Sequence, residues 1–247
     1  MSGAPFDWTR GDPLAVMTFD TDWVPQFMVD RCLDILAEGG ARATFFCTGP
    51  YDLRDPESFE AALHPNFLPG STQGQDPESV MTWLKSVHPG AVGSRSHKYF
   101  WYSDIRPLLR RHGMLYDCTQ FLPGQSHTGL VDHLGLRRAG TWWSDNLHLM
   151  GGLDLTRFDP PGLLTPGLKV LDFHPIHVYM NSPSREWFRD AMAGLPPVPE
   201  LREADVAARR FDGPGIGTLL ELAVRRLRDI QGETWTMAGL VRRELGL

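Results

Sequence analysis

The chain has 247 residues, of which 42% are hydrophobic and 22% are charged, as in an ordinary globular protein. Its formal net charge of −6 argues against a nucleic-acid-binding protein, and no apolar run approaches the roughly 18 residues that a membrane-spanning helix needs. The N-terminus lacks a signal-peptide pattern, and the three cysteines show no CxxC spacing, which is typical of reduced, buried thiols. We therefore expect a cytoplasmic protein that contacts neither nucleic acid nor membrane, while its oligomeric state stays open.

Strand-like and helix-like segments alternate along the chain. The predicted strands are short apolar runs that span residues 14–19, 43–47, 59–63, 91–93, 114–120 and 169–173. The predicted helices span residues 25–37, 76–87 and 103–112, with largely helical chain beyond residue 199. Residues 123–136 are predicted to form a loop. This alternation predicts an α/β fold with a mainly parallel sheet and helices outside, and a (β/α) barrel is compatible with this length.

Polar side chains fall at or just after the ends of the predicted strands. There are six of them: Asp20, Asp22, His64, Arg95, His97 and His174. In α/β folds of this kind the carboxyl ends of the parallel strands meet at one edge and carry the functional residues. The sequence therefore predicts a single shared site at that edge.

Two carboxylates lie two residues apart in Thr18–Asp22, at the end of a buried strand. Residues i and i+2 of a strand point to the same side, and two like charges there are costly unless a cation neutralises them. We predict that Asp22 binds a divalent metal ion, unless it instead caps the helix that begins near Pro25. His64 and His97 are the other predicted ligands, since one carboxylate with two histidines leaves open positions on such an ion. The histidines expected instead at helix ends or in loops are His88, His112, His127, His133 and His148.

The other strand-end residues, Asp20, Arg95 and His174, have side chains that can transfer a proton or orient a group that does. Asp20 is the predicted general base, because it lies on the same side as Asp22 and needs no bond to the ion. His174 is the predicted general acid, with His177 as the alternative. Arg95 is expected to orient Asp20 through a bidentate pair, and the alternative is an exposed ion pair at the surface.

Aromatic residues crowd these motifs, and sugar rings stack on such side chains. For any single aromatic residue, packing in the core is the better interpretation. Trp23 is the exception, because it directly follows a predicted ligand. The predicted substrate-binding residues are Trp23, Asn66, Phe67, Trp143 and Asp145.

Taken together, the motifs resemble those of the polysaccharide deacetylases, the NodB-homology or carbohydrate esterase 4 group. Thr18–Asp22 resembles the first motif of that family, in which the first Asp is the base and the second binds the metal. Leu63–His64 resembles the second motif, whose first His is a ligand, and Arg95 falls where the third-motif arginine is expected. The stretch 142–145 loosely resembles the fourth motif, and Phe173–His174 resembles the fifth, which ends in the acid histidine.

This resemblance implies a fold and a cofactor. The fold is a distorted (β/α) barrel of the NodB-homology type with fewer than eight strands, which we take as seven. The cofactor is one divalent ion, zinc in the first instance, with Co²⁺, Mn²⁺ and Ni²⁺ as alternatives. We expect a single catalytic domain over residues 1–247, with a motif-bearing core at about 14–180 and closing helices at about 200–247.

Two departures from the family pattern concern the ligands. The second His of the second motif would fall at Leu68, and Ser96 and His97 follow Arg95 where the family has Pro and Tyr. These features resemble the divergent branch that includes the WbmS-type proteins of O-antigen clusters. We infer that His97 replaces the missing ligand.

The expected function is metal-dependent hydrolysis of a non-peptide C–N bond, most simply deacetylation of an N-acylated sugar or small metabolite. One alternative is a ureide or other small-amide hydrolase, which would release ammonia instead of acetate or formate. A second alternative is a catalytically degenerate barrel that binds a glycan or a partner and holds no stoichiometric metal.

Overall fold

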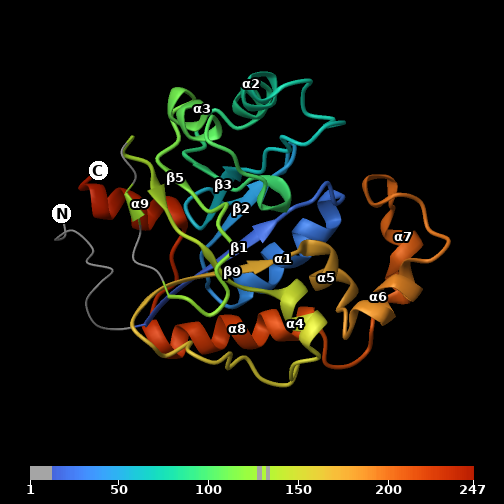
Figure 1. The fold of residues 1–247 in the computed structure, drawn as a ribbon. Helices are drawn as coiled ribbons and strands as arrows, with labels where there is room; N and C mark the ends of the chain where they lie inside the picture. Colours follow the sequence, from blue (N-terminus) through green and yellow to red (C-terminus); the bar gives the residue numbers. More distant parts are fainter. Residues whose placement is uncertain (1–12, 127–129, 132–133) are drawn as a thin grey trace.

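The computed structural model describes residues 13–126, 130–131 and 134–247, so His127 and His133 lie outside the described residues. Helices surround a central sheet, and α8 runs along one side of it while α2 and α3 cover the opposite end (Figure 1). Within the described residues, no helix combines the length and the apolar character needed to cross a membrane.

The sheet joins its strands in the order β6-β7-β5-β4-β3-β2-β1-β9-β8. Their bounds are β1 Pro13–Asp20, β2 Ala43–Cys47, β3 Phe59–Leu63, β4 Gly93–Ser94, β5 Tyr116–Asp117, β6 Leu130–Val131, β7 Arg137–Arg138, β8 Thr141–Ser144 and β9 Gly167–Phe173. Neighbouring strands are parallel except for β6 and β7, which are antiparallel. The predicted parallel α/β architecture is confirmed, but the expected count of seven strands is wrong, because eight described strands run parallel.

The sheet curves back on itself beyond β5. Phe121 forms a parallel bridge with Thr141 of β8, and the backbone N–H of Leu122 donates to the carbonyl of Thr141 at 2.9 Å. The chain that follows β5 thereby reaches the strand at the other end of the sheet. This closure produces the distorted (β/α) barrel that the motifs implied.

Four helices, α1 to α4, connect strands, and α5 to α9 follow the last strand. Their bounds are α1 Gln26–Glu38, α2 Pro77–Val87, α3 Ile105–Arg111, α4 Asp145–Gly151, α5 Pro175–Met180, α6 Arg185–Met192, α7 Glu203–Val206, α8 Ile216–Gln231 and α9 Met237–Leu245, with 3-10 turns at His97–Tyr99, Val198–Glu200 and Ala207–Arg209. The apolar faces of α1, α5 and α8 pack together in one core cluster with β1, β2 and β9. Burial of these faces stabilises the helices more than their intrinsic propensity does.

Aromatic stacking joins β1 to its two neighbours in the sheet, β2 and β9. The ring of Phe19 on β1 stacks on Phe45 of β2 at 4.6 Å and on Phe173 of β9 at 5.7 Å between centroids. Such pairs add to the stabilisation from buried area. The carboxyl ends of β1 and β9 are therefore fixed relative to each other before any ligand binds.

The structure differs from the sequence prediction in the short elements. The predicted strand at 91–93 is Gly93–Ser94, and only Tyr116–Asp117 of 114–120 is a strand. Strand β8 and helices α4, α5 and α6 were not predicted, because residues 141–144 lack a clean alternation and the helices are only six to eight residues long. All three cysteines are free and buried, as expected.

Candidate metal centre and active site

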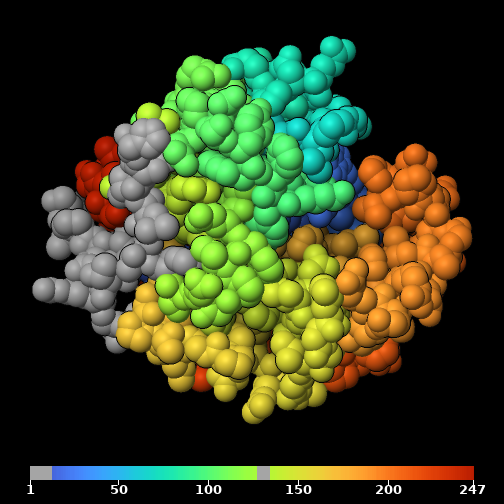
Figure 2. Space-filling model, viewed as in Figure 1, coloured from blue at the N-terminus to red at the C-terminus, as the bar shows by residue number. Residues whose placement is uncertain are grey.

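A pocket of about 330 Å³ lies at the carboxyl ends of the parallel strands. Of the six predicted strand-end residues, the pocket is lined by Asp20, Asp22, His64, His97 and His174. Arg95 is fully buried behind it. On the face drawn in Figure 2, the surface is hollowed between the green segment that follows β4 and the yellow helix α4. The structure thus brings together residues from four separate stretches of the chain.

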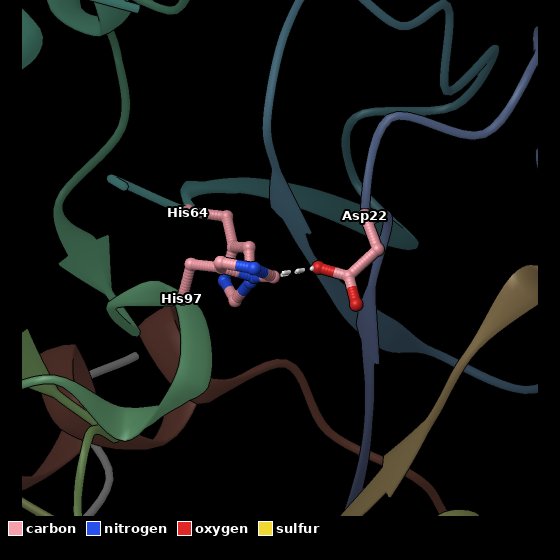
Figure 3. Close-up of side chains that lie close together, drawn as sticks. All are labelled: Asp22, His64 and His97. Atoms are coloured by element: carbon pink, nitrogen blue, oxygen red, sulfur yellow. Dashed lines mark hydrogen bonds and ion pairs between the residues drawn. The ribbon is translucent and has the colours of Figure 1, made fainter. Parts of the chain in front are cut away.

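Asp22, His64 and His97 converge in the pocket, as Figure 3 shows. The Oδ1 atom of Asp22 lies 3.2 Å from Nε2 of His64 and 3.0 Å from Nδ1 of His97. One candidate ligand atom from each residue can be chosen so that all three lie within 4.8 Å of one another. One carboxylate oxygen and two imidazole nitrogens are a donor set typical of zinc and similar divalent ions.

The environment of His64 supports a cation at this position. Its side chain is 1% exposed, and its Nδ1 atom has no hydrogen-bond partner among the residues that the structure describes. The nearest carboxylate oxygen, Oδ1 of Asp20, lies 3.7 Å away. An orphaned buried nitrogen beside two carboxylates is costly unless something else satisfies it. The residues present therefore fit a divalent ion.

Two of the three segments that carry the candidate ligands contain strained backbone. Asp22 and Trp23 have φ of 42° and 57°, and Lys98 and Tyr99, which follow His97, have φ of 56° and 54°. Non-glycine residues rarely adopt this left-handed conformation, and it concentrates at functional sites. The first turn is held by bonds from the backbone N–H groups of Val24 and Trp23 to Thr21 and Thr48.

The electrostatics of the ligands reflect their proximity. Burial would raise the pKa of Asp22, but the hydrogen bonds from His64 and His97 outweigh it and hold that pKa below its usual range. Burial would lower the pKa of His64, but the carboxylates of Asp20 and Asp22 outweigh it and raise that pKa. The cluster thus attracts positive charge, whether a proton or a metal ion supplies it.

Arg95 lies against two carboxylates rather than one. Its Nη1 atom donates to Oδ1 of Asp20 at 2.8 Å and to Oδ1 of Asp172 at 2.9 Å. The expected bidentate pair with Asp20 is therefore wrong, because the same nitrogen is shared. Sequence reasoning missed Asp172, although a carboxylate within an apolar strand and two residues before His174 was a usable signal. Burial and the charge of Asp20 raise the pKa of Asp172.

His174 is positioned by Asp145 at the start of α4. Its Nδ1 lies 2.7 Å from Oδ1 of Asp145, and its backbone N–H donates to Oδ2 of the same carboxylate at 2.6 Å. Burial lowers the pKa of His174, but the charges of Asp145 and Asp172 outweigh it and raise it well above the usual value. The Nε2 atom lies 3.8 Å from Oδ2 of Asp22. Asp145 and Asp172 therefore favour the protonated form of this ring beside the candidate ligands.

His177 has a different environment. Its Nδ1 lies 3.1 Å from the hydroxyl of Ser182, and its ring packs on Phe188 at 4.5 Å. Burial lowers its pKa to about 4, so the ring is neutral at neutral pH. In the described structure His177 packs behind His174, away from the pocket wall.

None of the predicted substrate-binding residues lines the pocket. Trp23 packs edge-on against His97 at 4.9 Å, and Asn66 uses its side chain to accept from the N–H of Leu68. Phe67 packs on a core cluster beneath α2 and α3, and Trp143 is buried against Phe173, while Asp145 lies under His174.

Other residues form the pocket wall instead, and the sequence did not indicate them. They are Lys98, Tyr99, Phe121, Ser144, Asn146, Leu147, Met150 and Asp172. Phe121 and Met150 are 37% and 62% exposed, which is high for large apolar side chains. Most of them lie on β8, on α4 or in the segment that pairs with β8, so their placement depends on elements that local patterns did not predict.

Comparison with known proteins gives a consistent result. A family model described as WbmS-like polysaccharide deacetylase matches residues 17–192. WbmS from Bordetella bronchiseptica, assigned as a polysaccharide deacetylase involved in O-antigen biosynthesis, has a TM-score of 0.74 at 27% identity over 86% of this chain and 90% of that chain. A Mycobacterium smegmatis polysaccharide deacetylase has a TM-score of 0.58 at 19% identity, over 99% of this chain and 94% of that one. No curated protein matches the chain significantly.

The matched range includes all six of the strand-end residues from which the site was predicted. The Bc1960 peptidoglycan N-acetylglucosamine deacetylase shares the fold at a TM-score of 0.50 and 12% identity, covering 93% of this chain and 90% of that chain. The resemblance seen in the motifs is thus confirmed over most of the chain. The chain belongs to the WbmS-like polysaccharide deacetylase family.

Proposed function

We propose that this protein is a metal-dependent hydrolase that removes an acyl group from the nitrogen of a sugar or small metabolite. The observation that carries the proposal is the convergence of three candidate ligands with the carboxylate of Asp20 and the imidazole of His174 on one pocket. Asp22, His64 and His97 would hold the ion. When bound there, a divalent ion such as zinc supplies Lewis-acid activation of the acyl carbonyl and a water of lowered pKa.

Asp20 is the proposed general base. It is 5% exposed, lines the pocket beside His64, and is held by Arg95 at 2.8 Å. A carboxylate in this place accepts the proton of the attacking water as the new C–O bond forms. Arg95 limits the orientations that Asp20 can adopt, which keeps its free oxygen directed at the pocket.

His174 is the proposed general acid. The carboxylate of Asp145 accepts a hydrogen bond from Nδ1–H of His174. The other ring nitrogen, Nε2, is therefore the one available to the pocket that His174 lines. Nε2–H donates its proton to the leaving amine as the C–N bond breaks. Base and acid thus come from neighbouring strands, at the end of β1 and directly after β9.

The pocket size and the relatives favour a small saccharide substrate. A volume of about 330 Å³ lies at the lower end of the usual range for ligand sites. The WbmS protein, which is 27% identical, is described as acting in O-antigen biosynthesis. An N-acylated monosaccharide or its activated derivative fits both observations better than a long polymer.

The test is product release by purified protein supplied with zinc, cobalt or manganese. We expect acetate or formate from an N-acylated amino sugar, with Asp20→Asn as the inactive control. Ammonia release would instead indicate a ureide or primary-amide hydrolase. Binding of a glycan with neither metal nor hydrolysis would contradict the proposal and favour a degenerate barrel.

A further inference from the structure

We propose that Asp172 is a positioning residue for the general base: together with Tyr99 it holds Arg95, and through Arg95 it holds Asp20. This inference rests on the proposed function, because it assigns Asp172 a part in the same hydrolysis. Neither the family motifs seen in the sequence nor the proposed mechanism gives Asp172 a role.

Every donor group of the Arg95 side chain has a fixed partner. Nη1 donates to both Asp20 and Asp172. Nη2 donates to the hydroxyl of Thr18 at 2.9 Å, and Nε donates to the carbonyl of Cys118 at 3.4 Å. The guanidinium also lies over the ring of Phe46, 4.2 Å from its centroid. Arg95 therefore has one position, and Asp172 and Asp20 share the nitrogen that defines it.

Tyr99 fixes the other oxygen of Asp172. Its hydroxyl donates to Oδ2 at 3.0 Å, and its ring packs on Phe121 at 5.1 Å on the pocket wall. The left-handed backbone at residues 98 and 99 is needed to send His97 to Asp22 and Tyr99 to Asp172 from one short turn. The strained turn thus makes two contacts, His97 with Asp22 and Tyr99 with Asp172, and all four residues line the pocket.

A purely structural ion pair does not explain this arrangement. Asp20 and Asp172 are 5% and 1% exposed, and their Oδ1 atoms share the single Nη1 of Arg95, whereas a strong arginine–carboxylate pair is commonly bidentate. A cation held by Asp20, Asp172 and His174 would compete with Arg95, which already donates to Oδ1 of both aspartates, and with Tyr99, which donates to Oδ2 of Asp172. A role for Asp172 in orienting Arg95, and through Arg95 the base, accounts for this sharing.

The decisive variant is Asp172→Asn, with Glu60→Gln as its matched control. The amide removes the negative charge that holds Arg95, and it either turns a donor toward Arg95 or requires the Tyr99 hydroxyl to accept instead of donate. We expect kcat to fall about ten- to a hundredfold while KM changes less than about twofold, because ground-state contacts are kept. Glu60 also accepts from a tyrosine but lies outside the pocket, so Glu60→Gln should leave kcat unchanged.

A double-mutant cycle separates positioning from general damage. If Asp172 acts through Asp20, then adding Asp172→Asn to Asp20→Asn should lower the residual kcat by less than about twofold. A full multiplicative loss in the double variant would overturn the inference. Tyr99→Phe gives a second route to the same conclusion, with a smaller loss of kcat and an unchanged pocket wall.

Crystal structures of the variants provide a readout that needs no activity. We expect the Arg95 guanidinium and the Asp20 carboxylate to shift in Asp172→Asn and not in Glu60→Gln. Unchanged positions in Asp172→Asn would overturn the inference even if the enzyme is an active deacylase. Conversely, a wild-type protein that hydrolyses no amide would contradict the proposed function while the structures still decide whether Asp172 positions Asp20.

Discussion

Glu60 and Asp172, two carboxylates on strands of the sheet, each accept a hydrogen bond from a tyrosine hydroxyl, yet their surroundings differ. Glu60 on β3 accepts from Tyr116 at 2.7 Å, and its other oxygen accepts from the Thr44 hydroxyl at 2.7 Å and the backbone N–H of Ala238 at 2.8 Å. Asp172 on β9 accepts from Tyr99 but must share Arg95 with Asp20. Both arrangements are buried wholly or in part, and both join strands distant in the sequence.

The hydrogen-bond partners in the two networks distinguish a structural network from a functional one. The Glu60 network is complete, since each carboxylate oxygen has a donor and the N-terminus of α9 closes it. Each oxygen of Asp172 also has a donor, but Asp172 and Asp20 share one nitrogen of Arg95, and His64 beside Asp20 has a ring nitrogen without a partner among the described residues. Buried polar groups that stay unsatisfied are costly, so their persistence indicates a ligand or a reaction.

The largest effect should come from removing a candidate ligand. We expect Asp22→Ala and His97→Ala to lose the bound metal and to lower kcat/KM at least about a thousandfold, because the ion activates both carbonyl and water. Metal content by mass spectrometry and acyl release by product assay measure the two effects. Glu60→Ala should keep both. Full metal occupancy in His97→Ala would show that this residue is not the third ligand.

The second effect separates the two candidate acids. His174→Ala should lower kcat by about a hundred- to ten-thousandfold with metal content unchanged, as expected for loss of a general acid. His177→Ala should lower the melting temperature and leave kcat within about tenfold, because this ring packs on Phe188 rather than lining the pocket. The opposite ranking of kcat would assign the acid to His177.

The third effect concerns the pH dependence of the acid. His174 must be protonated to act, so activity is lost as pH rises through its pKa. The charge of Asp145 raises that pKa, and Asp145→Asn should therefore move the loss of activity to lower pH. We also expect kcat to fall roughly ten- to a hundredfold at neutral pH, because the ring loses its orienting bond. An unchanged alkaline limb in the profile of kcat against pH would contradict this role.

The smallest effect on catalysis should come from the structural network. Tyr116→Phe removes a donor from Glu60, and we expect a loss of about 1 kcal/mol, equivalent to roughly 2–4 °C in melting temperature for a chain of this size. Its kcat should equal that of wild type. Tyr99→Phe, the matching change in the other network, should instead lower kcat. Equal effects of the two variants on kcat would remove the distinction between the networks.

Much of the fold and part of the site followed from local signals. The strands at 14–19, 43–47 and 59–63 and the helices at 25–37 and 76–87 were predicted to within two residues, because long buried elements carry strong periodicity. The two-residue strands β4 and β5 were placed less well, since their pairing depends on neighbouring strands and not on their own composition.

By itself, the sequence determined the chemistry at the strand ends: Asp20 and Asp22 after an apolar run, and His64 and His174 each directly after a strand. These signals act over a few residues, and the parallel sheet then collects them at one edge. Only the tertiary structure decided that Asp172 meets Arg95, 77 positions away, and that His177 turns behind the pocket. Such contacts depend on the register of β1 against β9 and on the closure of β8, which no local pattern specifies because they join residues far apart in the chain.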